Sequence, residues 1–117
     1  MENKSIISAK TFEFALQIIE LYVQLIEEKE FVISKQLLRS GTSIGANVEE
    51  ANAGFSKKDF IYKMSIASKE ARETRYWLLL LEKSNLTKVP IEDYIDEVNH
   101  IINILTKIVK TSMEKEK

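Results

Sequence analysis

Apolar residues recur at alternating spacings of three and four along most of this chain. This spacing places side chains on one side of an α-helix, as in helices that pack side by side in a bundle. Four stretches share the pattern: 5–28, 32–53, 57–84 and a last one that follows Pro90. Because long helices joined by short links become antiparallel neighbours, we predict an all-α fold. Residues 1–117 are expected to form one domain, an antiparallel up-down-up-down four-helix bundle.

The first stretch carries two apolar rows. The row expected to face the core contains Ala9, Phe12, Leu16, Ile19, Val23 and Ile26. The second row contains Phe14, Ile18, Leu21 and Leu25. It lies two residues away, which is ~200° around the helix. A helix that covers a four-helix core needs one apolar face, so the second row is expected to contact another subunit. On this interpretation, Ile18→Glu with Leu21→Glu gives folded monomers.

The third stretch, residues 57–84, repeats this feature. Its expected core row contains Phe60, Met64, Ala67, Ala71, Thr74, Leu78 and Leu81. Roughly opposite lie Tyr62, Ile66, Trp77 and Leu80. A ligand groove is one interpretation, but aromatic side chains are enriched at protein interfaces. We therefore predict a homo-oligomer, in which the chain's partner is another copy of itself.

The second stretch and the turn after it carry local signals. Its core row contains Ile33, Leu37, Ile44, Val48 and Ala51. Gly41 and Gly45 lie along one edge of that row and allow a neighbouring backbone to approach closely. Gly54 is expected in the left-handed conformation that closes a helix. Ser56, three residues before Asp59, matches an N-terminal cap of the next helix. The fourth stretch has core positions at Ile91, Ile95, Val98, Ile102, Leu105 and Val109.

The charge balance weakens the case for a dedicated nucleic-acid-binding domain. Seventeen basic and eighteen acidic residues leave a net charge of −1, whereas phosphate binding usually requires a basic excess. A local basic stripe remains on the third stretch: Lys57, Arg72, Arg75 and Lys83. Nucleic acid is therefore a disfavoured partner. Pairing with nearby acidic residues is the favoured interpretation of the stripe.

Other sequence features limit the chemistry. The chain has no cysteine, so a disulfide or a thiolate metal site is excluded. Its longest apolar run, Tyr76–Leu81, is far too short to span a membrane, and residues 1–4 do not resemble a secretory signal. We expect a cytoplasmic protein without a membrane, metal or cofactor requirement. Glu97 and His100 have a metal-ligand spacing, but His100 is the only histidine and lies away from the predicted core.

Catalysis has no visible machinery in this sequence. A nucleophile set that needs histidine cannot be built around an outward His100. The glycine-containing stretch Arg39–Gly45 is not followed by the lysine of a phosphate-binding loop, and its apolar repeat continues as a helix. We therefore predict that the chain is not an enzyme.

Several motifs resemble those of the 23S rRNA intervening-sequence protein family. They are Ser43–Ala51, Asp59–Ile61, Lys69–Leu78 and Ile104–Val109. The characteristic polar and aromatic positions are occupied by Arg39, Asn47, Glu50, Glu70, Arg72, Glu73, Tyr76 and Trp77. Ala51 stands where many members have glycine.

The resemblance implies a homopentamer of four-helix subunits around an axial channel, without an established activity. It favours a self-assembling scaffold or adaptor. The alternative is an accessory protein that binds RNA, DNA or a ribonucleoprotein. A related protein of this kind is the accessory variability protein of retroelements, which is a basic pentamer. The near-neutral charge of the present chain departs from that relative.

Overall fold

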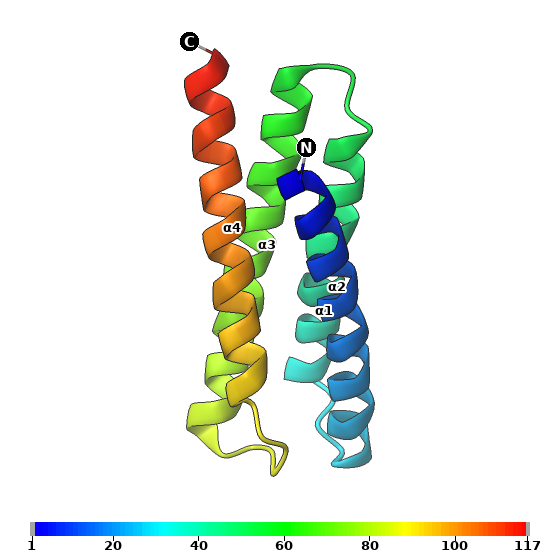
Figure 1. Cartoon of the computed structure of the whole chain (residues 1–117). Coiled ribbons are helices and arrows are strands. Elements are labelled where there is room, and N and C mark those ends of the chain that lie inside the picture. The colour runs from blue at the N-terminus through cyan, green and yellow to red at the C-terminus, as the bar shows by residue number, and fades with distance from the viewer. Residues whose placement is uncertain (1, 117) are drawn as a thin grey trace.

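The computed structural model describes residues 2–116, and over that range it consists of four helices without a strand. They are α1 (Glu2–Glu27), α2 (Ile33–Asn52), α3 (Lys57–Ser84) and α4 (Glu92–Glu116). The rod measures 48 × 21 × 21 Å. The α1–α2 and α3–α4 loops lie at one end of the rod, and the α2–α3 loop lies at the other (Figure 1). The predicted all-α class and the four helices are confirmed.

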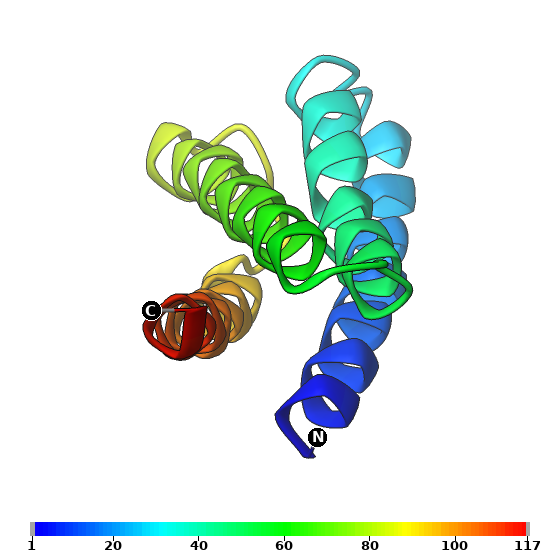
Figure 2. The ribbon, with the colours of Figure 1, turned by 90° about the horizontal axis from the view of Figure 1, so that it is seen from above.

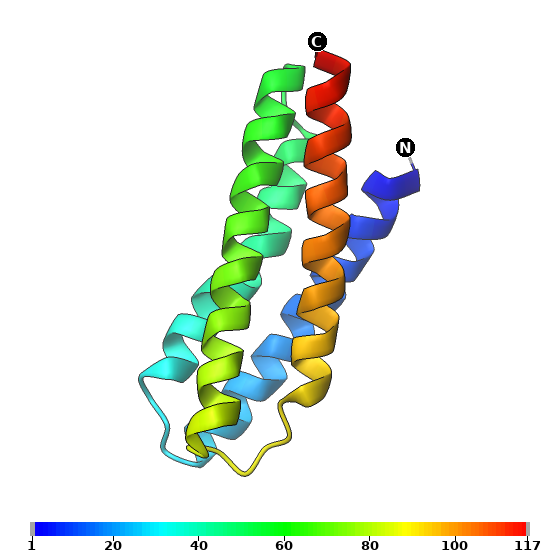
Figure 3. The same cartoon turned by 90° about the vertical axis from the view of Figure 1, so that its left-hand side faces the viewer.

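The four helices surround one core, with α1 and α3 at opposite corners. Figure 2 looks along the rod and shows α2 between α1 and α3, with α4 across the bundle from α2. Towards the end that carries the chain termini, α1 leans away from α4 (Figure 3). The described part of the core takes side chains from all four helices.

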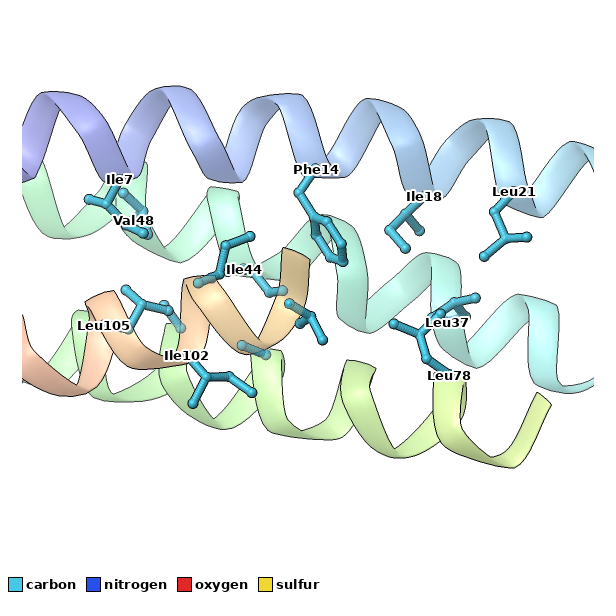
Figure 4. Close-up of a cluster of buried hydrophobic side chains, with 14 of the residues drawn as sticks. Ile7, Phe14, Ile18, Leu21, Leu37, Ile44, Val48, Leu78, Ile102 and Leu105 are labelled. Atoms are coloured by element: carbon cyan, nitrogen blue, oxygen red, sulfur yellow. The ribbon is translucent and has the colours of Figure 1, made fainter. Parts of the chain in front are cut away.

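The predicted orientation of α1 was wrong. Its second row is the buried one: Phe14, Ile18, Leu21 and Leu25 are all 0% exposed. Figure 4 shows Phe14, Ile18 and Leu21 pointing from α1 into the bundle. The predicted core positions Phe12, Leu16, Ile19 and Val23 are instead between 42 and 66% exposed. The buried row therefore cannot be the subunit contact of a folded subunit.

The buried row of α1 includes a threonine. The buried row begins earlier, with Ile7 and Thr11, and so continues with the same spacing along the helix. Thr11 is 1% exposed, and its buried hydroxyl donates to the Ile7 carbonyl at 2.8 Å. A threonine can thus extend an apolar row once its hydroxyl is bonded to the preceding turn.

The close approach of α1 and α2 depends on the two predicted glycines. A Cβ atom on Gly41 would lie 2.9 Å from Cγ2 of Ile18, and one on Gly45 would lie 3.3 Å from the Thr11 carbonyl oxygen. Larger side chains at these positions would force the helices apart. The predicted role of Gly41 and Gly45 is confirmed.

The core rows of α2 and α3 were predicted correctly. Their central positions, from Leu37 to Ala51 and from Met64 to Leu81, are buried, while Ile33 and Phe60 at the ends are half-buried. One polar pair, Ser40 of α2 and Thr74 of α3, lies between the two rows. The Thr74 hydroxyl is 2.8 Å from Ser40 Oγ and 2.8 Å from the Glu70 carbonyl oxygen. Both side chains are fully buried. Each hydroxyl has a partner, so the pair fixes the register of α2 against α3 without an unpaired polar group.

The helix ends show one confirmed cap, one error and one cap that the sequence analysis missed. Ser56 Oγ accepts a hydrogen bond from the Asp59 amide at 3.1 Å, as predicted. Gly54 does not have a positive φ; Lys29 and Asn85 do. A Cβ on Gly54 would instead lie 3.2 Å from the Ala51 carbonyl oxygen, so close packing explains the glycine. The missed cap is Glu30, whose carboxylate accepts from the amides of residues 32–34 at 2.6 to 3.0 Å.

Candidate interaction surfaces

The most distinctive surface is the outward side of α1. Phe12, Leu16, Ile19 and Val23 form a row of exposed apolar side chains, which we name the α1 outer face. The row is offset by two residues, or ~200° around the helix, from the buried row, so the same residues cannot serve both surfaces. A contiguous apolar face of this kind on a small protein marks an interaction site.

The edge of the α1 outer face next to α2 is hollowed. Phe12 and Ala15 of α1 line the hollow together with Thr42, Gly45 and Ala46 of α2. Of these α2 residues, Gly45 lies close to α1, because a Cβ on it would be 3.3 Å from the Thr11 carbonyl oxygen. The surface therefore combines large protruding side chains with a shallow depression, which is the relief that a packed interface uses.

The predicted interface residues of α3 occupy different environments. Tyr62 is 64% exposed, whereas Ile66 and Leu80 are half-buried. Trp77 packs against the core, and its indole Nε1 donates to Glu73 Oε2 at 2.9 Å. Trp77 and Tyr76 meet edge to face, with ring centroids 5.3 Å apart. Trp77 therefore joins the core to the polar α2–α3 surface, and Tyr62 and Tyr76 present most of the exposed aromatic surface of α3.

The characteristic polar positions of the motifs link α2 to α3. Arg39 bridges two carboxylates of α3, with Nη1 3.3 Å from Glu70 Oε1 and Nη2 bonded to Glu73 Oε2. Because Glu73 also accepts from Trp77, one network connects Arg39 to the core. These groups are partly exposed, and each such ion pair contributes only about 0.2–1 kcal/mol. Their arrangement supports a role in positioning the two helices.

Two further motif positions form their own links. Glu50 of α2 binds Lys63 of α3, with 2.7 Å between Oε1 and Nζ. This bond raises the pKa of the Lys63 ammonium. Asn47 donates to the Ser43 carbonyl at 2.9 Å, within α2. Both contacts stabilise the fold locally.

The predicted basic stripe divides into a central pair and two distant ends. Arg72 Nη2 donates to Thr106 Oγ1 at 3.3 Å, and Arg75 Nη1 donates to Asn99 Oδ1 at 3.1 Å. Both arginines thus face α4 and bind neutral groups. The favoured interpretation had expected both to pair with acidic residues. Among the described side chains, however, neither arginine has a carboxylate within ion-pair distance. Lys57 and Lys83 lie near opposite ends of α3, and Lys83 is 4.0 Å from Glu82.

The two weak site motifs are not assembled in the structure. His100 is exposed, and Glu97 binds Lys10 of α1 at 3.3 Å. Among the side chains that the structure describes, no group of three or more potential metal ligands converges. The stretch Arg39–Gly45 lies inside α2, so its amides are used within a helix. Over the described range, no helix combines the length and apolarity needed to cross a bilayer.

A carboxylate joins the two loops at one end of the rod. Glu28 accepts from the Thr87 hydroxyl and from the Lys88 amide, the latter at 3.0 Å. These bonds lower the pKa of the Glu28 carboxyl. On the neighbouring α1–α4 side, burial raises the pKa of the Tyr94 hydroxyl. Hydrogen bonding thus explains the pKa shift of Glu28, and burial explains that of Tyr94.

Comparison with known proteins places these features in context. The sequence model of a family described as 23S rRNA-intervening sequence protein matches residues 3–107. The chain also resembles a crystal structure from Bacteroides thetaiotaomicron, of a protein with unknown function from the S23 ribosomal protein family. The two are 46% identical with a TM-score of 0.85, and the match covers 92% of this chain and 98% of the other. No curated protein matches. Neither description names an enzymatic activity.

Proposed function

Because the chain belongs to the 23S rRNA-intervening sequence protein family, we propose that it is a non-enzymatic, self-assembling scaffold or adaptor. In this proposal, up-down-up-down subunits form a homo-oligomeric ring, as a homopentamer, in the cytoplasm and without a metal or cofactor. The observation that carries the proposal is the α1 outer face. Its apolar row is exposed in the isolated subunit although the core of that subunit is already complete.

The energetics favour covering this face. Removing apolar surface from water contributes about 25 cal/mol per Å², and the side chains that form the row are large. Soluble monomers rarely expose a contiguous apolar patch of this kind. A contact repeated around a closed ring would cover the row in every subunit. The same repetition would display one surface several times, which suits a scaffold.

The test is native mass spectrometry of the purified protein, with its ultraviolet absorbance ratio. We expect a homo-oligomer without nucleic acid. Leu16→Glu with Val23→Glu should give helical monomers, because both residues lie on the α1 outer face. His100→Glu with Thr111→Glu is the matched control, since it adds two carboxylates at exposed positions of α4. A wild-type monomer at micromolar concentration would contradict the proposal.

The second candidate is an accessory protein that binds RNA, DNA or a ribonucleoprotein. It is favoured by one observation, namely that Arg72 and Arg75 donate to neutral partners and that no described carboxylate pairs with either. In an oligomer, several copies of this pair would act together. Nucleic acid that copurifies with the protein and dissociates at high salt would support this candidate. Its loss in Arg72→Gln with Arg75→Gln would assign the binding to these two side chains.

A further inference from the structure

A row of carboxylates follows the α1 outer face. Glu13, Glu20 and Glu27 are spaced by seven residues, which is ~10.5 Å along a helix. None of the three forms an ion pair with a described side chain. Lys10 is the one basic residue among the described side chains of α1, and it already binds Glu97. The surface to be covered is therefore apolar on one side and acidic on the other.

This charge pattern opposes an antiparallel two-fold contact between two α1 helices. In such a contact the same patch of both copies meets itself. The glutamates of one copy would then lie on the same side as those of the other, and like charges in close contact are destabilising. The partner of the α1 outer face should instead offer apolar groups together with positive charge.

The groove between α3 and α4 has that chemistry. Arg72, Lys110, Val109 and Met113 line it, with the small side chains of Ser65 and Ser68 between the helices. Met113 is 54% exposed. Glu114 also lines the groove, and Arg75 lies about one turn beyond Arg72 on α3. Arg72 and Arg75 donate to neutral groups only, so their charges are available to an acidic partner.

The spacing of the cations matches that of the glutamates. Arg72 of α3 bonds Thr106 of α4, and Lys110 lies four residues beyond Thr106, in the direction along the rod opposite to that of Arg75 from Arg72. Four residues on α4 and three on α3 together span ~10.5 Å, so Arg75 and Lys110 mark two levels at about the separation of Glu13 and Glu20. The two surfaces also belong to different sides of one subunit, since α1 and α3 occupy opposite corners (Figure 2).

We propose that the α1 outer face of one subunit docks into the α3–α4 groove of a second copy of this chain. Phe12, Leu16, Ile19 and Val23 cover the apolar part of the groove, while Glu13 and Glu20 face its cations. The contact is head-to-tail, because each copy uses one surface to bind and the other to be bound. Such contacts form rings when the rotation closes. This inference rests on the self-assembly proposed above and adds the identity of the acceptor surface.

The experiment is a charge exchange measured by analytical ultracentrifugation. Glu13→Arg with Glu20→Arg should weaken assembly by roughly 10- to 100-fold in Kd, as should Arg75→Glu with Lys110→Glu. Combining all four substitutions in one chain should restore assembly to within about 10-fold of the wild type, because the charges are again opposite. Circular dichroism checks that each variant is helical.

The outcomes separate this inference from the proposed function. A wild-type oligomer that Leu16→Glu with Val23→Glu dissociates, but that every charge variant leaves intact, overturns the α3–α4 groove as acceptor and leaves self-assembly standing. Weakening by both pairs without rescue in the combined chain also overturns it. Should Arg75→Glu with Lys110→Glu unfold, Arg75→Gln with Lys110→Gln replaces it. The neutral pair should then weaken assembly, and unchanged assembly would overturn the inference.

Discussion

Gly41 of α2 lies directly against Ile18 of α1, with space for a hydrogen but not for a methyl group. A Cβ built at Gly41 would be 2.9 Å from Cγ2 and 3.0 Å from Cγ1 of Ile18. This contact sets both the distance between the two helices and the rotation of α1. It thereby places the Phe14 row in the core and leaves the Phe12 row outside.

Gly41→Ala should destabilise the protein even though alanine favours a helix. The substitution gains ~1 kcal/mol of helix propensity, but overpacking a core typically costs about 1–3 kcal/mol. Ile18 is β-branched and has little rotamer freedom in a helix to move away. We expect a net loss of about 1 kcal/mol in a urea titration. Ser43→Ala, at a half-buried position of the same helix, is the control; a Gly41→Ala variant more stable than wild type would contradict the argument.

Ile18→Glu and Ile19→Glu should have opposite consequences. Ile18 is fully buried, so its replacement places a carboxylate in the core and should remove cooperative folding, at a cost of at least about 3 kcal/mol. Ile19 is 44% exposed, so Ile19→Glu should stay helical and reduce assembly. This corrects the expectation that Ile18→Glu with Leu21→Glu gives folded monomers. Circular dichroism and thermal melts distinguish the two variants.

The buried pair of Ser40 and Thr74 should behave as a unit. Thr74→Val leaves the Ser40 hydroxyl without its partner on α3 and should destabilise by about 1–3 kcal/mol. Adding Ser40→Ala removes the second polar group, so the double variant should lose less than the sum of the two single variants. A double-mutant cycle in urea measures this coupling. Additive losses would mean that the two hydroxyls do not depend on one another.

Glu28 should make stability depend on pH in the acid range. Its carboxyl pKa is lowered from 4.5 by the Thr87 and Lys88 hydrogen bonds, so the folded state favours the ionised form. The resulting stability is present above the unfolded pKa and is lost as pH falls through the folded pKa. Glu28→Gln should therefore lower the urea midpoint at pH 7, and the difference should shrink below pH 4.5. Glu27→Gln, at the neighbouring exposed position, is the control at equal protein concentration.

The sequence alone determined the number of helices, their approximate bounds and the core rows of α2 and α3. The α2 row faces a side of small and polar residues, and the α3 row runs unbroken whereas the apolar positions opposite it are interrupted by Lys69 and Glu73, so one rotation of each helix is favoured. The pairing of Ser56 with Asp59 and the roles of Gly41 and Gly45 also followed from local chemistry. The cap by Glu30 was missed because a glutamate outside the helix is not among the usual N-cap residues.

Only the tertiary structure decided which face of α1 is inside. Both rows of α1 are apolar and have the same spacing, so periodicity along a single helix gives two equally good rotations. The choice is made by contacts that are distant in sequence, above all Ile18 against Gly41 and Thr11 against Gly45. The same contacts decide which apolar row remains for a partner. Local pattern thus specified the helices, and packing between them specified the surface by which the protein is expected to act.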